Sequence, residues 1–125
     1  MANVLIVDDE IECQFLLQVI FQRAGHTTQL AGDAATSLAT ISQSPPDVIV
    51  LDDMLPDFSG SEVCRRLKGS PSTRHIPVLL YSAGCNVRNR SHLAAIGADA
   101  ALGKPSTPRE LVQTVDRLLS RIPSL

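Results

Sequence analysis

The sequence predicts an α/β fold in which five short parallel strands alternate with five helices. Two observations support this: five apolar runs recur along the 125 residues, and the segments between them have helical periodicity. The runs at 4–7 and 48–51 are apolar throughout, as is typical of parallel strands covered on both faces. We therefore expect a (βα)5 three-layer sandwich, with a doubly wound parallel five-stranded sheet between two layers of helices.

The predicted strands follow the apolar runs. They are Val4–Val7, Thr27–Ala31, Val48–Leu51, Val78–Tyr81 and Ala100–Leu102. The first helix is expected over Glu12–Ala24 and ends at Gly25. Its core stripe has the spacing i, i+3, i+4, i+7 and consists of Leu17, Ile20, Phe21 and Ala24. Phe15 and Val19 fall on the opposite side of the helix, so we expect an exposed apolar patch there.

Capping signals mark three of the remaining helices. Asp33 is a good N-cap for the second helix, and Ser59 with Glu62 has the spacing of a capping box for the third. The fourth helix, at His92–Ile96, has the weakest signal, because the poor helix formers Asn86, Asn89 and Ser91 precede it. Thr107 and Glu110 form a second capping box, and the fifth helix has the apolar stripe Leu111, Val115, Leu118 and Ile122.

Composition excludes several classes of protein. The length fits one domain, and we expect residues 1–125 to be a single domain without an output domain. The net charge of −2 gives no reason to expect direct contact with nucleic acid. No apolar run approaches the roughly 18 residues of a membrane span. Three scattered cysteines without metal-ligand spacing indicate reduced thiols, and therefore a cytoplasmic protein.

Chemically active side chains follow four of the five strands. Asp8 and Asp9 follow the first strand, Asp52 the third, Ser82 ends the fourth, and Lys104 follows the fifth. Ligands of such sheets bind beyond the carboxyl ends of the strands, so these groups should meet. Clustered carboxylates repel one another unless a cation lies among them, and Mg²⁺ is the hard cation that suits them. A lysine and a hydroxyl suit a phosphoryl group, and a carboxylate between them is a plausible nucleophile.

Four segments resemble the receiver domain of two-component response regulators, a CheY-like family. They are VLIVDDE at 4–10, DVIVLDDMLPDFSG at 47–60, PVLLYSAG at 77–84 and GADAALGKP at 97–105. The resemblance covers essentially the whole chain. It implies a flavodoxin-like sheet with the strand order 2-1-3-4-5.

By position, the resemblance implies that Asp52 is the phosphoacceptor rather than Asp53. Asp52 lies four residues before Pro56 and eight before Gly60, which is the family spacing. Asp8, Asp9 and Asp52 would bind Mg²⁺ together with the backbone carbonyl of Met54. Ser82 and Lys104 would contact the phosphoryl group, and the peptide bond between Lys104 and Pro105 would be cis.

The resemblance also implies the function and partners. A histidine kinase or phosphotransfer protein donates a phosphoryl group, the domain hydrolyses it slowly, and a downstream target protein recognises the change. The domain is then a signalling switch rather than an enzyme. Apart from the resemblance, the exposed patch at Phe15 and Val19 could serve either a partner or a homodimer. One position departs from the family: Ala101 stands where an aromatic switch residue usually lies, and Ser106 replaces a frequent second aromatic.

Three other functions fit the sequence less well. A phosphate-independent pseudo-receiver that signals by docking alone usually lacks one of the site residues, all of which are present here. An aspartyl-nucleophile phosphatase needs Asp-x-Asp after its first strand, whereas Asp52-Asp53-Met54 follows the third. A flavin-binding protein needs a phosphate-cradling first loop, where Asp8-Asp9-Glu10 would repel the phosphate.

Overall fold

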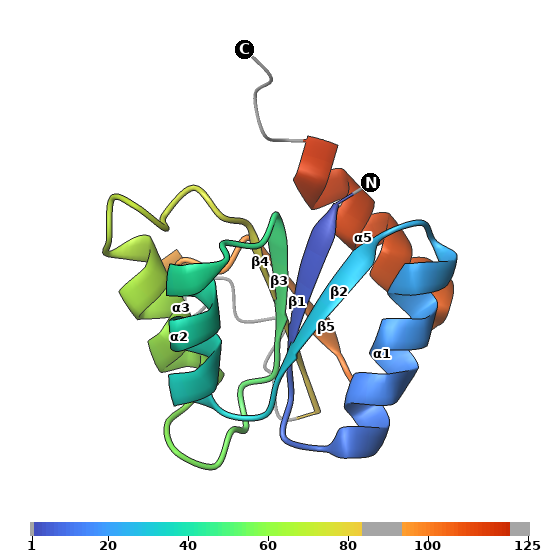
Figure 1. Ribbon diagram of the computed structural model, residues 1–125, viewed down its shortest axis with the longest axis horizontal. Helices are drawn as coiled ribbons and strands as arrows, with labels where there is room; N and C mark the ends of the chain where they lie inside the picture. Colours follow the sequence, from blue (N-terminus) through green and yellow to red (C-terminus); the bar gives the residue numbers. More distant parts are fainter. Residues whose placement is uncertain (1, 84–93, 121–125) are drawn as a thin grey trace.

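The structure of the protein, a computed structural model, describes residues 2–83 and 94–120. Within that part of the chain the strands are β1 (Asn3–Val7), β2 (Thr27–Ala31), β3 (Val48–Leu51), β4 (Val78–Ser82) and β5 (Ala100–Gly103). They form one parallel sheet in the order β2-β1-β3-β4-β5, which confirms the implied topology (Figure 1). Each strand lies within one residue of its predicted bounds.

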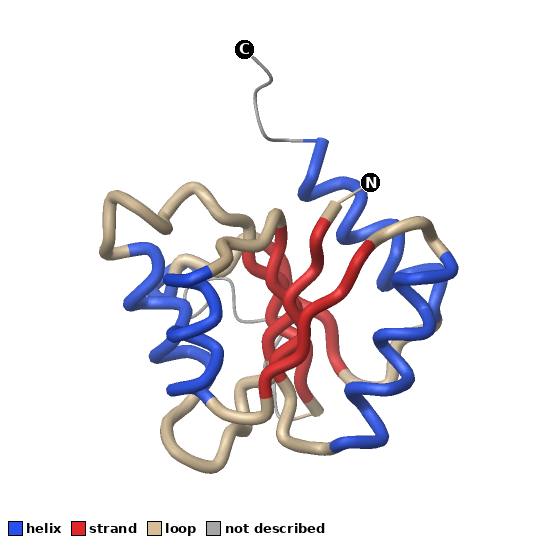
Figure 2. The backbone as a smooth tube through the Cα atoms, in the orientation of Figure 1, coloured by secondary structure: helices blue, strands red, loops and turns tan. Residues whose placement is uncertain are grey.

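The helices form a layer on each face of the sheet, as predicted. Those described in full are α1 (Ile11–Arg23), α2 (Ala34–Gln43), α3 (Gly60–Lys68) and α5 (Pro108–Ser120). Helices α2 and α3 cover one face, and α1 and α5 cover the other (Figures 1 and 2). The predicted fourth helix is described only at 94–96, which are helical; residues 84–93 and Ile122 lie outside the described residues.

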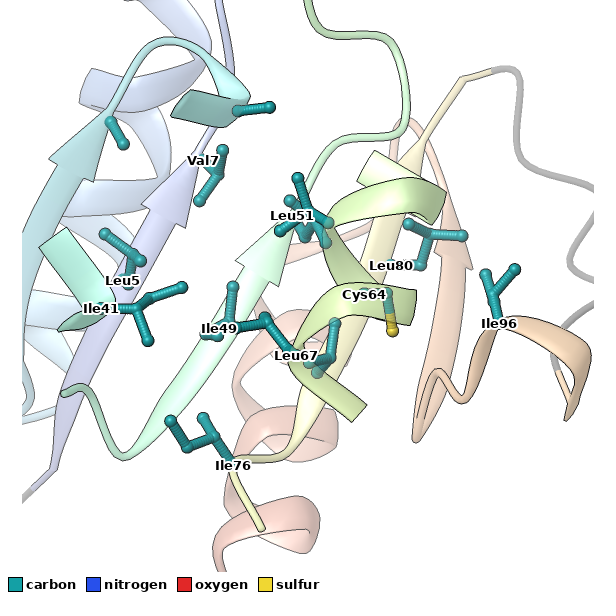
Figure 3. Close-up of a cluster of buried hydrophobic side chains, with 14 residues drawn as sticks. Leu5, Val7, Ile41, Ile49, Leu51, Cys64, Leu67, Ile76, Leu80 and Ile96 are labelled. Carbon is teal, nitrogen blue, oxygen red and sulfur yellow. The ribbon is translucent and has the colours of Figure 1, made fainter. Parts of the chain in front are cut away.

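Alternating residues of each inner strand feed two separate apolar clusters. On β1, Leu5 and Val7 point toward α2 and α3, where Figure 3 shows them among the other buried side chains of that cluster. Val4 and Ile6 belong to the second cluster, against α1 and α5. All four are fully buried, which explains why this strand is apolar throughout.

The caps predicted from the sequence start three helices. The Asp33 carboxylate accepts a hydrogen bond at 2.6 Å from the amide three residues on. The Ser59 hydroxyl accepts one from the amide of Glu62 at 3.1 Å, although the Glu62 carboxylate bonds two arginines of α3 rather than returning to the cap. Thr107 and Glu110 form both bonds of a capping box.

One prediction about α1 was wrong. The helix spans Ile11–Arg23 rather than Glu12–Ala24, and Ala24 is its exposed C-cap instead of a core residue. The helix ends one residue earlier because the chain turns at Gly25, whose φ of 93° is in the left-handed region that favours glycine. The other three stripe residues, Leu17, Ile20 and Phe21, are buried as predicted.

The first strand begins, and the last helix ends, at the edge of the sheet away from the strands' carboxyl ends (Figure 1). His26 joins the two ends of the chain at this edge: its Nδ1 accepts a hydrogen bond from the amide of Ala2 at 3.2 Å, and its Nε2 lies 3.1 Å from Oδ1 of Asp116.

Among residues 2–83 and 94–120, no helix has the length and apolar character needed to cross a membrane.

Candidate functional site

The register of β1 and β3 brings two of the predicted aspartates to the same edge. Val7 pairs with Leu51, so Asp8 and Asp52 are the next residues on their strands. The amide of Asp52 donates to the carbonyl of Val7 at 2.9 Å, which extends the ladder by one residue. Asp8 is 1% exposed and Asp52 is 5% exposed, so both carboxylates are removed from water at the end of the sheet.

Asp8, Asp9 and Asp52 form an acidic cluster, as the sequence predicted. One carboxylate oxygen of each lies within 4.8 Å of those of the other two. Asp9 is exposed, whereas its two neighbours are buried. Three carboxylates at this spacing repel one another, and oxygen ligands of this kind fit Mg²⁺. The donor set could therefore hold a divalent cation at the mouth of the site.

Lys104 supplies positive charge to the two buried carboxylates. Its Nζ lies 2.6 Å from Oδ2 of Asp8 and 3.2 Å from Oδ2 of Asp52. Burial lowers the pKa of Lys104, but the hydrogen bond and charge of Asp8, followed by the charge of Asp52, outweigh it and raise the pKa above its ordinary value. The lysine is charged throughout the physiological pH range. The peptide bond that follows it, to Pro105, is cis as implied.

Asp52 and Asp53 have different surroundings although they are adjacent. Oδ1 of Asp53 accepts hydrogen bonds from the Ser61 amide at 2.7 Å and the Ser61 hydroxyl at 2.6 Å, at the start of α3. Oδ1 of Asp52 accepts a bond from the amide of Met54, at 3.1 Å, and Oδ2 faces Lys104. The Asp53 carboxylate thus accepts hydrogen bonds at the start of α3, while the Asp52 carboxylate belongs to the acidic cluster.

Two contacts fix the loop that carries Asp52. A Cβ on Gly60 would collide with the carbonyl oxygen of Asp52 and lie 2.9 Å from Cα of Asp53, which explains the glycine eight residues after Asp52. The carboxylate of Asp57 accepts hydrogen bonds at 2.9 Å from the amides of both Ala34 and Ala35, at the start of α2. The loop is therefore anchored to both helices of this layer.

Ser82 is fully buried at the end of β4. Among the described residues, its hydroxyl oxygen is the one buried side-chain polar atom without a hydrogen-bond partner. Leaving a buried hydroxyl unsatisfied costs free energy, so such groups usually have a role that supplies a partner.

The predicted site residues other than Asp8 line one hollow of about 280 Å³. Its lining consists of Asp9, Glu10, Asp52, Met54, Ser82, Ala83 and Lys104. Three carboxylates, a hydroxyl and an ammonium thus converge on a space that admits a small anion together with a cation. Asp8 does not line this hollow; its carboxylate pairs with Lys104 and lies in the acidic cluster with Asp9 and Asp52.

Two neighbours of the site were missed by the sequence interpretation. Cys13, on the first turn of α1, has a thiol pKa raised to about 12, first by burial and then by the nearby carboxylate of Asp8. Tyr81 contacts the lysine: Nζ of Lys104 lies 5.6 Å from the centre of its ring. The spacing of these residues in the sequence gave no signal for either contact.

Comparison with known proteins gives one consistent family. The model of a family described as the response regulator receiver domain matches residues 4–116. The phosphate regulon transcriptional regulatory protein PhoB of Pseudomonas aeruginosa is 37% identical over 119 residues, which cover 95% of this chain and 52% of that protein. The transcriptional regulator RpaA of a Synechocystis species is 36% identical over 121 residues, covering 97% and 50%. The chain spans about half the length of these relatives.

Solved structures agree with the sequence relatives. A putative response regulator from Chloroflexus aurantiacus has a TM-score of 0.89 at 30% identity, covering 96% of this chain and 98% of that one. The signal receiver domain of a histidine kinase from Syntrophus aciditrophicus has a TM-score of 0.88 at 31% identity, covering 100% and 97%. In both, the similarity extends over nearly the whole of each chain.

Proposed function

The chain belongs to the response regulator receiver family of two-component systems, and we propose that Asp52 accepts a phosphoryl group from a phosphohistidine donor. The donor is a histidine kinase or a phosphotransfer protein, and the acyl phosphate signals to a downstream target protein in the cytoplasm. The observation that carries this proposal is the buried hydroxyl of Ser82, which has no hydrogen-bond partner among residues 2–83 and 94–120 and lies beside Asp52 and Lys104 in one hollow. A phosphoryl oxygen is the acceptor that this hydroxyl lacks.

In the proposed step, an oxygen of the Asp52 carboxylate attacks the phosphorus atom of phosphohistidine. The phosphorus–nitrogen bond breaks, and its electron pair stays on the imidazole nitrogen of the donor. The product is an acyl phosphate on Asp52. The signal ends when water attacks the same phosphorus and the bond to Asp52 breaks, which releases inorganic phosphate and restores the carboxylate.

The residues around Asp52 supply position and charge, which is most of what phosphoryl transfer requires. Lys104 would bind one phosphoryl oxygen as a point charge, and the Ser82 hydroxyl would donate a hydrogen bond to another. Asp8, Asp9, Asp52 and the carbonyl of Met54 would hold Mg²⁺. When bound, Mg²⁺ would neutralise phosphoryl charge that the carboxylates would otherwise repel.

The exposed face of α1 is the surface we assign to the phosphoryl donor. Phe15 and Val19 are 60% and 45% exposed, as the sequence predicted, and Ile11 and Leu16 extend the patch at 66% and 59% exposure. Helix α1 begins three residues after Asp8, so the patch starts beside the acidic cluster. A donor that packs apolar side chains against this face would present its histidine near Asp52.

The test is phosphorylation of the purified chain by acetyl phosphate with Mg²⁺, followed by mapping of the modified residue by mass spectrometry. We expect acyl phosphate on Asp52 and its loss in Asp52→Asn. Asp53→Asn is the matched control, because it removes the charge of the neighbouring carboxylate, which accepts hydrogen bonds from Ser61. This variant should retain phosphorylation. Modification of Asp53 in the wild-type chain would move the acceptor by one residue.

A phosphate-independent docking domain is the outcome that would replace this proposal. It would form no acyl phosphate with acetyl phosphate or with any phosphohistidine donor. In that case the variants Asp52→Asn and Ser82→Ala should bind partners as well as the wild type does.

A further inference from the structure

Tyr81 connects parts of the site, and none of the roles above uses it. It precedes Ser82 on β4, is 6% exposed, and packs in the apolar cluster under α1 and α5. Its hydroxyl accepts a hydrogen bond from the amide of Ser106 at 3.2 Å. Its ring also lies beside the Lys104 ammonium, with 5.6 Å between Nζ and the ring centre.

We propose that Tyr81 is a positioning residue for Lys104, an inference that rests on the proposed function of the site. The hydroxyl holds the backbone two residues beyond the lysine, where the Ser106 hydroxyl also donates to the carbonyl of Gly103 at 2.9 Å. The face of the ring attracts the ammonium through the ring quadrupole. One aromatic side chain thereby holds both the segment that carries Lys104 and the charged end of its side chain.

Core packing alone does not account for these contacts. Leu79 lies two residues earlier on β4, in the same cluster, and is fully buried. A leucine at 81 could fill the same apolar space but would offer neither an acceptor for the Ser106 amide nor a ring face for the lysine. The hydroxyl and the ring face of Tyr81 therefore make contacts with the site that core packing does not require.

Tyr81 does not replace the aromatic residue that is absent at Ala101. Ala101 packs against the cluster under α2 and α3, on the same face as Leu80, whereas Tyr81 packs on the opposite face. Its contacts run to Lys104 and Ser106 rather than into the space next to Ala101. Tyr81 therefore contacts the lysine and does not fill the space on the face of the sheet where Ala101 packs.

The sequence provides a direct probe of this contact. Tyr81 is the single tyrosine and the chain has no tryptophan, so ultraviolet emission excited in the tyrosine band comes from this residue. A phosphoryl group on Asp52 would draw the Lys104 ammonium toward the new anion and change the environment of the ring. We expect the emission to change when Lys104 is replaced by Met, and again when the wild-type chain is phosphorylated.

The experiment measures phosphorylation by acetyl phosphate with Mg²⁺ in Tyr81→Phe, Tyr81→Leu and the core control Leu79→Ala. Loss of the hydroxyl in Tyr81→Phe should slow the reaction about threefold, and loss of ring and hydroxyl in Tyr81→Leu about tenfold. Leu79→Ala should stay within about twofold although it removes core volume. Circular dichroism establishes that each variant is folded, and Leu79→Val replaces Leu79→Ala if the latter is not.

The rate of phosphorylation in the Lys104→Met background separates a positioning role of Tyr81 from a packing role. There, adding Tyr81→Leu should lower the residual rate by less than about twofold, because the residue that it positions is gone. A Tyr81→Leu variant that reacts at the wild-type rate, or that loses about tenfold even without Lys104, would overturn the proposal.

Failure of the proposed function would look different. If the wild-type chain forms no acyl phosphate, the phosphoacceptor assignment fails, but the emission of the unphosphorylated wild type and Lys104→Met can still be compared. Equal emission from these two folded proteins would overturn the contact between Tyr81 and Lys104 on its own.

Discussion

The ammonium of Lys104 forms its shorter ion pair with Asp8, at 2.6 Å, rather than with Asp52, at 3.2 Å. The lysine therefore has two tasks at different stages. Before phosphorylation it is the counter-ion of two buried carboxylates, and in the proposed phosphorylated state it also binds the phosphoryl group. A cation that binds Asp8 and Asp52 must compete with the charge of this lysine.

Replacing Lys104 with methionine should destabilise the metal-free protein by about 3 kcal/mol, because two buried carboxylates lose their counter-ion. Adding Mg²⁺ should restore more stability to the variant than to the wild type, since the metal supplies the missing charge. Urea unfolding with EDTA or Mg²⁺ measures both effects. The raised pKa of Lys104 means that its contribution is complete below the ordinary value of 10.5 and is lost as the pH rises further.

Arg65→Met is the control for the lysine variant. Arg65 pairs with Glu62 at 3.1 Å on the surface of α3, with 53% of its side chain exposed. Removing such a pair costs at most about 1 kcal/mol, and the cost should not depend on Mg²⁺. Equal Mg²⁺ dependence in the two variants would contradict the counter-ion role of Lys104.

Asp9→Ala should weaken Mg²⁺ binding about tenfold, because one of three ligand charges is lost at a partly solvated position. Isothermal titration with Mg²⁺ measures this directly, and phosphorylation by acetyl phosphate should fall with it. In EDTA the free energy of unfolding should not decrease, since the change relieves repulsion with Asp8 and Asp52. Glu12→Ala removes an exposed charge from α1 outside the cluster and should leave the affinity unchanged. If the Mg²⁺ affinity of Asp9→Ala is unchanged, Asp9 is not a ligand of the metal.

Introducing lysines at Phe15 and Val19 should leave folding intact and weaken a partner interaction of α1. Both side chains are exposed, so the free energy of unfolding should change by less than about 1 kcal/mol. Transfer from a cognate histidine kinase should slow, while phosphorylation by acetyl phosphate, which needs no docking surface, should not. Leu30→Lys on β2 is the control, because Leu30 is an exposed apolar residue outside α1.

The alternative occupant of this patch is a second copy of the chain. Sedimentation of the Phe15→Lys, Val19→Lys variant beside the wild type distinguishes the two occupants. A wild-type dimer that the variant abolishes, with kinase transfer unchanged, would assign the patch to self-association instead of to the donor.

The Cys13 thiol should become more reactive when a metal binds. Burial and then Asp8 raise its pKa to about 12, so a cation on Asp8 should lower that pKa and increase the reactive thiolate at a fixed pH. Alkylation by iodoacetamide at a pH of about 8.5, mapped by mass spectrometry, should speed up with Mg²⁺ and in Asp8→Asn. Cys64 is the internal control: burial raises its pKa to about 11, and Asp8 is not among the groups that shift it. Equal acceleration at both cysteines would contradict this account.

In the proposed function, Ala101 would change how phosphorylation is transmitted through the domain. Alanine has no side-chain rotamer to exchange, so we expect phosphorylation to act through the backbone that follows Ser82. Amide hydrogen exchange should change most at residues 84–93, with little change at Ala101. That segment lies outside the described residues, so this stays a prediction from the sequence. A flat response there, with a response in α1 or α5, would place the output surface elsewhere.

The features predictable from the sequence have local signals. Asp33 and Thr107 mark their helices because an N-cap bonds an amide within the first turn, independent of the rest of the fold. The site itself could be located because parallel strands end at one edge, so Asp8 and Asp52 had to meet there.

The unpredicted features depend on side-chain direction across elements. The engagement of Asp53 by Ser61, and of the Tyr81 hydroxyl by the amide of Ser106, joins residues through loops whose path has no sequence signal. The α1 patch was predicted from a helical wheel, which found Phe15 and Val19. The wheel missed Leu16, which is 59% exposed, because a wheel gives the direction of a side chain but not how much of it the rest of the fold covers.

His26 ties the start of the chain to α5 at the edge opposite the hollow. The five residues of β1 span about 17 Å between that edge and Asp8. Any polypeptide joined before β1 or after α5 would therefore start about a strand length away from the hollow and from the proposed phosphoryl chemistry. A domain fused there would sense phosphorylation either by folding back around the molecule or through a displacement carried along the whole length of the sheet and its helices.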